Sequence, residues 1–169
     1  MSCVAFNVKK KVITISLFLV ALFVNESLFA QNGVLMLHGK VVNKGSSLGG
    51  VTVEIISDQV DTIRTFTTPN NGSYKVMVPL GTVYSISFYK EGYVTKSIGV
   101  IGKALREVNI DGRYFYQLDI ELYLVGNDRE DETMIPPVAK LYIEDPKKGF
   151  TFDKQYVKWV QEEYREILE

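Results

Sequence analysis

The stretch from Thr65 to Tyr93 constrains the fold most, because apolar and polar residues alternate in it on both sides of a strong turn signal. Pro69-Asn70-Asn71-Gly72 provides a fixed φ, two residues that tolerate the left-handed region, and a glycine that favours it. Pro79-Leu80-Gly81 provides a second turn. Period-two alternation is typical of strands with one buried face, so this stretch predicts three strands joined by two turns.

The same alternation recurs before and after this stretch, with no helical period in between. Further strands are expected at Val34–Val42, Val51–Ile55, Val94–Ile101, around Arg106–Ile110, and at Gln117–Val125. Short strands at this spacing predict a mainly β fold, an antiparallel sandwich of about seven strands.

The first 30 residues have the pattern of a secretory signal peptide. Lys9, Lys10 and Lys11 precede the apolar run Val12–Val24, and Ala30 offers a cleavage point. The apolar run is shorter than the roughly 20 residues that a membrane span needs. We therefore expect an exported protein with no integral membrane segment after cleavage. An uncleaved N-terminal anchor is the alternative.

Charge and cysteine content exclude several classes of function. The formal net charge is −1, and removal of the leader with its three lysines makes it slightly more negative. Nucleic-acid binding would require a clustered basic face, so no nucleic-acid partner is expected. The single cysteine, Cys3, lies in the leader, so residues 31–169 must hold their fold without disulfides.

The composition changes at Gly126, which divides the chain after the leader into three parts. We expect a β-sandwich domain over 31–125, a linker over 126–137, and a C-terminal strand and amphipathic helix over 138–169. The linker contains the acidic run Asp128–Glu132 and the stiff pair Pro136-Pro137. The acidic run lacks the glycine and the spacing of a calcium-binding EF-hand loop, so a solvated linker is the preferred interpretation.

The C-terminal helix is predicted to begin after Asp153, a good N-cap residue. Its apolar residues fall within one arc of the helix and need a partner surface, either on this chain or on another protein. The residues that we expect to bind a partner protein are Tyr156, Trp159, Val160, Tyr164 and Ile167.

Residues 34–101 resemble the carboxypeptidase regulatory-like domain, a prealbumin-like (transthyretin-like) β-sandwich. The resemblance depends on five elements that occur in the family's order. These are Gly39–Val42, Leu48–Val53, Thr67–Tyr74 around Asn71-Gly72, Val78–Gly81, and Tyr84–Phe88 with Gly92-Tyr93. It implies a Greek-key sandwich that is usually non-catalytic, with no family active-site residues to transfer. The segment after Pro136 is similar to tails of small exported envelope proteins of Gram-negative bacteria.

No catalytic or metal-binding set is evident. His38 is the only histidine and lies on the outward register of its strand, so no Ser-His-Asp or Cys-His arrangement can be built without it. A zinc site would need mostly carboxylates, and we expect no metal and no cofactor. A hydrolase that uses Asp119 and Glu121, two residues apart on one strand face, is the remaining enzymatic alternative.

We therefore expect a non-enzymatic β-sandwich module of the Gram-negative envelope, in the periplasm or associated with the outer membrane. Its leading function would be protein binding or scaffolding, through the C-terminal helix and an envelope protein partner. The alternative is binding of a carbohydrate or another small ligand on an aromatic surface. Tyr114, Phe115 and Tyr116 would form that surface, with a glycan as one candidate ligand.

Overall fold

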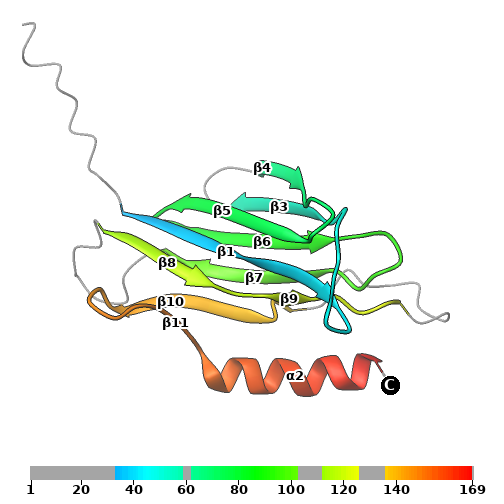
Figure 1. The fold of residues 1–169 in the computed structure, drawn as a ribbon. Helices are drawn as coiled ribbons and strands as arrows, with labels where there is room; N and C mark the ends of the chain where they lie inside the picture. Colours follow the sequence, from blue (N-terminus) through cyan, green and yellow to red (C-terminus); the bar gives the residue numbers. More distant parts are fainter. Residues whose placement is uncertain (1–32, 59–61, 103–111, 126–135, 169) are drawn as a thin grey trace, which may run out of the picture. The chain divides into compact units, whose positions relative to one another are not determined.

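The computed structural model describes residues 33–58, 62–102, 112–125 and 136–168, with side chains described as far as residue 163. The expected leader, most of the expected linker and the expected strand around residues 106–110 lie outside these ranges. Within them the chain forms two β-sheets and one helix (Figure 1), which confirms the mainly β, sandwich-like fold.

The first sheet is built around β1, the longest strand. β5 pairs antiparallel along one side of β1, whereas β8 and then β9 pair parallel along the other, and β2 continues the sheet at the end of β1. The strands of this sheet are β1 (Val34–Asn43), β2 (Ser46–Ser47), β5 (Ser73–Pro79), β8 (Arg113–Gln117) and β9 (Ile120–Glu121).

The second sheet has the order β11-β10-β7-β6-β3-β4, in which only the β10–β7 pair is parallel. Both sheets are therefore mixed, not purely antiparallel as the alternation suggested. The strands of this sheet are β3 (Thr52–Ser57), β4 (Thr62–Thr67), β6 (Val83–Tyr89), β7 (Lys96–Ile101), β10 (Ala139–Asp145) and β11 (Gly149–Phe152).

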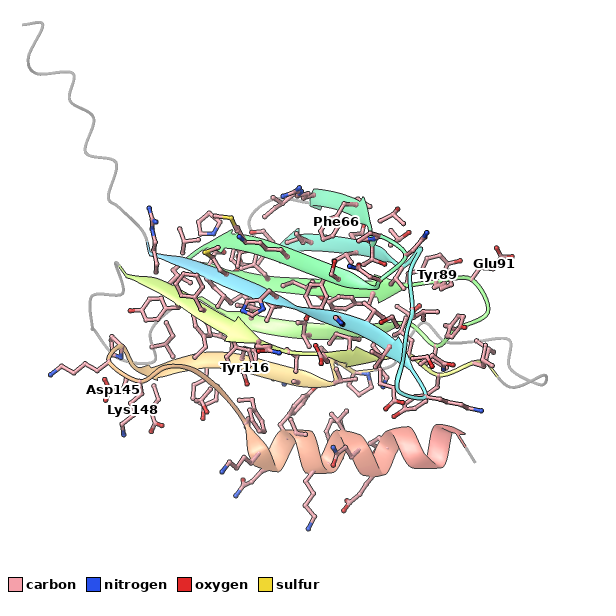
Figure 2. The ribbon with its side chains drawn as sticks, in the orientation of Figure 1. Phe66, Tyr89, Glu91, Tyr116, Asp145 and Lys148 are labelled. Atoms are coloured by element: carbon pink, nitrogen blue, oxygen red, sulfur yellow. The ribbon has the colours of Figure 1, made fainter. Side chains whose placement is uncertain are left out.

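The core lies between the two sheets and contains the inward-facing residues that the alternation predicted (Figure 2). Leu35 and Leu37 of β1, Val76 of β5 and Ile86 of β6 have no exposed surface. Burial of such aliphatic side chains contributes roughly 1.5–3 kcal/mol each. Because residues 31–169 contain no cysteine, this core is the main source of stability.

The turn at Pro69–Gly72 forms as its residues predict. The Gly72 N–H donates to the Pro69 carbonyl, and Gly72 has a φ of 69°. A Cβ at Gly72 would lie 2.4 Å from the Val41 carbonyl oxygen, so glycine is required both for its conformation and for its lack of a side chain. The turn therefore fixes the β5 register against β1.

The expected strand Gln117–Val125 is interrupted. β8 ends at Gln117 and β9 covers only Ile120 and Glu121, because the Asp119 carboxylate accepts the Lys40 backbone N–H at 2.8 Å. Ile120 and Leu122 are buried as the alternation predicts, but Leu124 is exposed.

The C-terminal segment differs from the expected appendage, because its strands belong to the sandwich. β10 pairs parallel with β7, and β11 pairs antiparallel with β10. Leu141, Ile143 and Phe150 are part of the main core. Only the helix α2 (Lys154–Leu168) extends beyond the two sheets.

The helix begins at the predicted N-cap and packs on its own domain. The Asp153 carboxylate accepts the backbone N–H groups of Gln155 and Tyr156, at 2.9 and 3.0 Å. Val160 is buried against Val94 of the segment before β7. The Lys140 amine on β10 lies 4.0 Å from the centroid of the Tyr156 ring.

Candidate functional site

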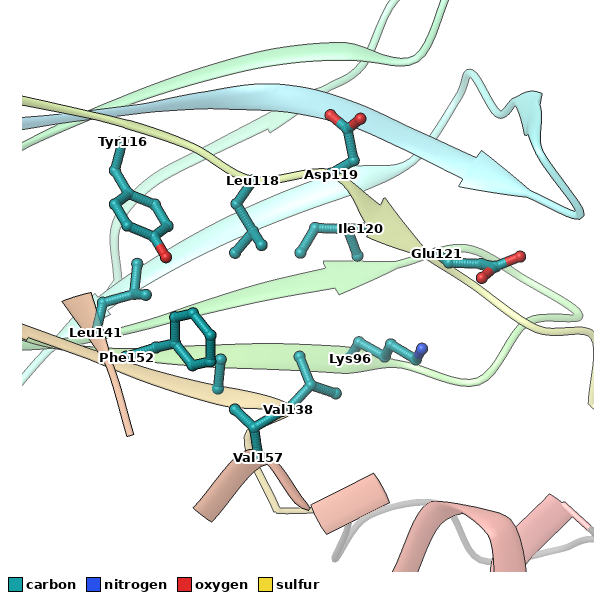
Figure 3. A pocket seen from close by; sticks show the side chains of 11 residues that line it. Lys96, Tyr116, Leu118, Asp119, Ile120, Glu121, Val138, Leu141, Phe152 and Val157 are labelled. Atoms are coloured by element: carbon teal, nitrogen blue, oxygen red, sulfur yellow. The ribbon is translucent and has the colours of Figure 1, made fainter. Parts of the chain in front are cut away.

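A cavity of about 240 Å³ lies between the two sheets on the side where α2 packs (Figure 3). Its walls come from β8 and β9 of the first sheet, from β7, β10 and β11 of the second, and from the first turns of α2. The lining residues are Lys96, Tyr116, Leu118, Asp119, Ile120, Glu121, Val138, Ala139, Leu141, Phe152 and Val157.

The size of the cavity limits what it can hold. An engineered cavity of about 150 Å³ can take up benzene, and sites for drug-sized ligands begin at about 300 Å³. The volume of about 240 Å³ therefore suits a group slightly larger than one aromatic ring.

Most of the wall is aliphatic or aromatic, and the Tyr116 side chain points its hydroxyl into this apolar space (Figure 3). Burial raises the pKa of the Tyr116 phenol, which keeps the hydroxyl protonated. Across the described part of the chain, no protein group hydrogen-bonds to this hydroxyl. It is therefore available to a molecule in the cavity as donor or acceptor.

Charged groups lie at the end of the cavity formed by β7 and β9. Lys96 occupies an inward position at the start of β7 and is only 9% exposed. Burial lowers the pKa of its amine from 10.5 to about 8, and the Glu121 carboxylate partly opposes that shift. The amine lies 4.1 Å from the centroid of the Tyr123 ring, in cation–π geometry.

Of the two carboxylates that line the cavity, Glu121 lies close enough to this amine to affect its pKa, whereas the Asp119 carboxylate points away from it (Figure 3). Glu121 accepts a hydrogen bond from the Tyr123 hydroxyl at 3.2 Å, and Asp119 accepts the Lys40 backbone N–H. Burial, with the Glu121 charge and this hydrogen bond, raises the pKa of Tyr123. The Lys96 amine and the Glu121 carboxylate balance one another in charge, so this end of the cavity offers an anionic ligand no net positive charge.

The aromatic residues expected to form one ligand surface are split between the two faces of β8. Phe115 is 64% exposed on the outer face. Tyr114 and Tyr116 pack against the core, and the Tyr114 ring meets Phe150 edge-on with centroids 5.9 Å apart. Because side chains alternate along a strand, the three cannot form a single platform, and only Tyr116 reaches the cavity.

The predicted partner-binding residues on α2 are also divided. Tyr156 and Val160 face the sandwich, whereas Trp159 is 47% exposed and packs its ring 5.7 Å from that of Tyr156. The side chains of Tyr164 and Ile167 lie outside the described part of the structure. Part of the apolar face expected to meet a partner, Tyr156 and Val160, is therefore occupied by the chain itself.

The described residues contain no group of three His, Cys, Asp or Glu side chains arranged to hold a metal ion. His38 lies in β1 opposite Lys75 and Gln117, on the outward register that the sequence predicts. The Asp119 and Glu121 carboxylates have separate structural partners, so they do not converge on a common point. None of the helices in the described ranges is long and apolar enough to span a bilayer.

Sequence reasoning missed Lys96, Val138 and Phe152 as site residues. Lys96 carried a usable signal, because it is a charged residue in the inward register of Ile98 and Val100. Val138 and Phe152 carried none, since their contribution depends on the pairing of β10 with β7.

Comparison with known proteins gives a likeness of fold only. No family model and no curated protein matches the chain. Among solved structures, a catechol 1,2-dioxygenase from Acinetobacter sp. ADP1, inhibited by bound mercury, is 14% identical with a TM-score of 0.46. That match covers 70% of this chain and 60% of the dioxygenase.

Two other solved structures are similar at the same low level. 3-Chlorocatechol 1,2-dioxygenase from Rhodococcus opacus 1CP is 13% identical, with a TM-score of 0.40 over 54% of this chain and 60% of that one. A DUF3823 family protein from Parabacteroides merdae ATCC 43184 is 16% identical, with a TM-score of 0.38. That match covers 54% of this chain and 47% of the other. The chain thus spans about 60% of the dioxygenase chains, and the similarity does not establish enzymatic activity.

Proposed function

We propose that this chain is a non-enzymatic binding module that holds a small, neutral, largely apolar molecule in the cavity between its sheets. The observation that carries the proposal is the Tyr116 hydroxyl, which points into an apolar space of about 240 Å³ and is not hydrogen-bonded by any group in the described ranges. Tyr116 is partly buried among apolar residues, so a ligand that accepts its hydrogen bond would be bound in preference to one that cannot.

The chemistry of the cavity defines the class of ligand. The apolar walls favour one aromatic ring or a short branched chain, and Tyr116 favours a carbonyl, ether or hydroxyl oxygen on it. The Glu121 carboxylate balances the charge of the Lys96 amine and most of the remaining wall is apolar, so the cavity disfavours an acid. The proposal places this module in the Gram-negative envelope as an exported carboxypeptidase regulatory-like domain, which is what its leader pattern and family resemblance suggest.

The proposal can be tested with three probes that share one benzene ring. Acetophenone has a hydrogen-bond acceptor, ethylbenzene has none, and benzoate is charged. Methyl ¹³C spectra of the protein should show saturable shifts at Leu141, Val157 and Ile120, strongest with acetophenone and weakest with benzoate. Tyr116→Phe should remove the preference for acetophenone over ethylbenzene but leave the binding of ethylbenzene itself.

Variants that fill the cavity provide the control for specificity. Val138→Phe and Val157→Phe add volume from two different elements and should abolish the shifts. Phe115→Ala, on the opposite face of the Tyr116 strand, should leave them unchanged. Equal shifts in the filled variants, or none with any probe in the wild type, would show that the cavity is not a binding site.

Protein binding or scaffolding in the envelope remains the second candidate, favoured by the exposed Trp159 on α2. Tryptophan is enriched at the centres of protein interfaces. A photo-crosslinking residue at position 159 in envelope preparations should capture one defined partner, and the same residue at Lys158 should capture less of it. Equal capture at the two positions would refute a role for Trp159.

A further inference from the structure

β4 is the strand of the second sheet that is least protected. Thr62–Thr67 pairs only with β3 among the described strands, and five of its six residues are exposed. Phe66, half-buried, turns toward the core near the first sheet (Figure 2). Apart from Arg64, the strand consists of threonine, isoleucine and phenylalanine, which favour β structure.

The other open edges carry features that discourage pairing. β5, at an edge of the first sheet, exposes Lys75 and ends at Pro79. β11, at the opposite end of the second sheet, lies beside β8, where Tyr114 meets Phe150. Lysine, proline and covering elements are the usual means by which proteins block edge-to-edge association. β4 has no proline and no lysine, and its one irregularity is an extra residue, Ile63, opposite the Ile55–Ile56 step of β3.

The hydrogen bonds between β3 and β4 determine which backbone groups of β4 point away from β3. The Thr68 N–H donates to the Val51 carbonyl of the β3 side at 2.8 Å. Because alternate residues of an antiparallel strand face the same neighbour, Phe66 and Arg64 also turn their N–H and C=O groups toward β3. Thr65 and Thr67 therefore present theirs outward, in the regular part of the strand beyond the bulge.

We propose that β4 is a self-association edge, at which two copies of this chain pair antiparallel, Thr65 of each opposite Thr67 of the other. Antiparallel pairing of two identical strands is two-fold symmetric, and because Thr65-Phe66-Thr67 reads the same in both directions it places like side chains opposite each other. This register forms four backbone hydrogen bonds from the outward groups, and it places Phe66 opposite Phe66 and threonine opposite threonine. Both are favourable cross-strand pairs.

Charge selects this register over its neighbours and favours a second copy as the occupant. When the pairing of the two copies is centred on Phe66, their Arg64 residues lie about four strand positions apart, which is roughly 13 Å. This distance exceeds the electrostatic screening length of about 8 Å in physiological salt. A register centred on Arg64 would oppose like charges directly. Each Arg64 also keeps its own contact with Phe66, at 5.3 Å from the ring centroid. No charge on the strand therefore opposes the pairing of two identical edges.

Sedimentation equilibrium and amide hydrogen exchange on the intact chain test the proposal. The wild type should form a concentration-dependent dimer, with the Thr65 and Thr67 amides protected at high concentration and exposed on dilution. Thr65→Pro removes an outward N–H without breaking the β3–β4 ladder, so the monomer should keep its circular dichroism spectrum. The loss of two intermolecular hydrogen bonds should weaken the dimer about 30-fold.

Thr65→Val is the matched control, because it keeps both the backbone N–H and the branched shape, and it should dimerise like the wild type. A wild-type protein that stays monomeric at millimolar concentration would overturn the proposal. So would a dimer that is unaffected by Thr65→Pro, or one in which the Thr65 and Thr67 amides exchange at the same rate at all concentrations. These measurements are independent of the cavity, which involves none of the β4 residues.

Discussion

Replacing Lys96 with methionine should stabilise the protein at neutral pH. The amine is held at an inward position of β7, and burial lowers its pKa from 10.5 to about 8. The charged form is therefore less stable in the folded protein than in the unfolded chain. Methionine keeps a stem of similar length, so it removes the charge while retaining the wall that Lys96 contributes to the cavity.

The size and the sign of the effect follow from the two pKa values. A difference of about 2.5 units corresponds to roughly 3 kcal/mol of destabilisation below pH 8, where both states are protonated. Between pH 8 and 10.5 the folded protein loses its proton first, so the unfolded chain binds more protons and stability rises with pH. The cation–π contact between Lys96 and Tyr123 offsets about 1 kcal/mol of this destabilisation and is lost in the variant. Lys96→Met should therefore raise the free energy of unfolding by about 2 kcal/mol at pH 7.

Urea unfolding of both proteins at pH 7, 8, 9 and 10 measures this difference. The gain should be constant up to about pH 8 and then shrink toward pH 10. The buried tyrosines titrate in both proteins and cancel in the comparison. Lys75→Met on the exposed edge of β5 is the control for the loss of a lysine charge at a surface position. A Lys96→Met protein that is less stable at pH 7, or a gain that is independent of pH, would refute the reasoning.

Two further substitutions test the packing that positions the site. Gly39→Ala should lower the free energy of unfolding by 2 kcal/mol or more. The new Cβ would lie 1.9 Å from the Leu118 carbonyl oxygen, which also accepts the Tyr74 hydroxyl; an unchanged melting temperature would contradict this contact. Asp153→Ala should cost about 1 kcal/mol through loss of the N-cap and should speed amide exchange in the first turn of α2. Unaltered exchange at Gln155 and Tyr156 would show that the cap is not needed.

The local chemistry of the sequence was enough to predict many of the strands, a principal turn and the start of the helix, but not β2, β8 or β11. The Pro69–Gly72 turn and the Asp153 cap depend on residues within four positions of each other, so their signals are contained in short stretches. Alternation predicted the buried faces of β1, β3, β5 and β6 for the same reason. The break in the strand at Asp119 was not predictable in this way, because its cause is a hydrogen bond to Lys40, far away in the sequence.

The cavity depends on pairings that no local pattern reveals. Its residues extend from Lys96 to Val157, and they meet only because β10 pairs parallel with β7. The composition change at Gly126 suggested a domain boundary. Yet the strand after it completes the second sheet, since Leu141 and Ile143 bury their side chains in the same core as the earlier strands. Parallel pairing requires a long connection, which makes a composition change a poor guide to where a sheet ends.

The polar groups of the cavity distinguish a binding site from a packing defect. A void left by imperfect packing is expected to be lined by apolar groups alone, since a polar group inside it would lose its hydrogen bonds to water without replacement. Here Tyr116 directs its hydroxyl into the space, although phenylalanine would fill the same position without that cost. Retention of the hydroxyl is explained if a ligand or a bound water accepts it. Tyr116→Phe separates a binding site from a packing defect. If the cavity is a defect, the substitution should stabilise the protein and leave the preference for acetophenone unchanged.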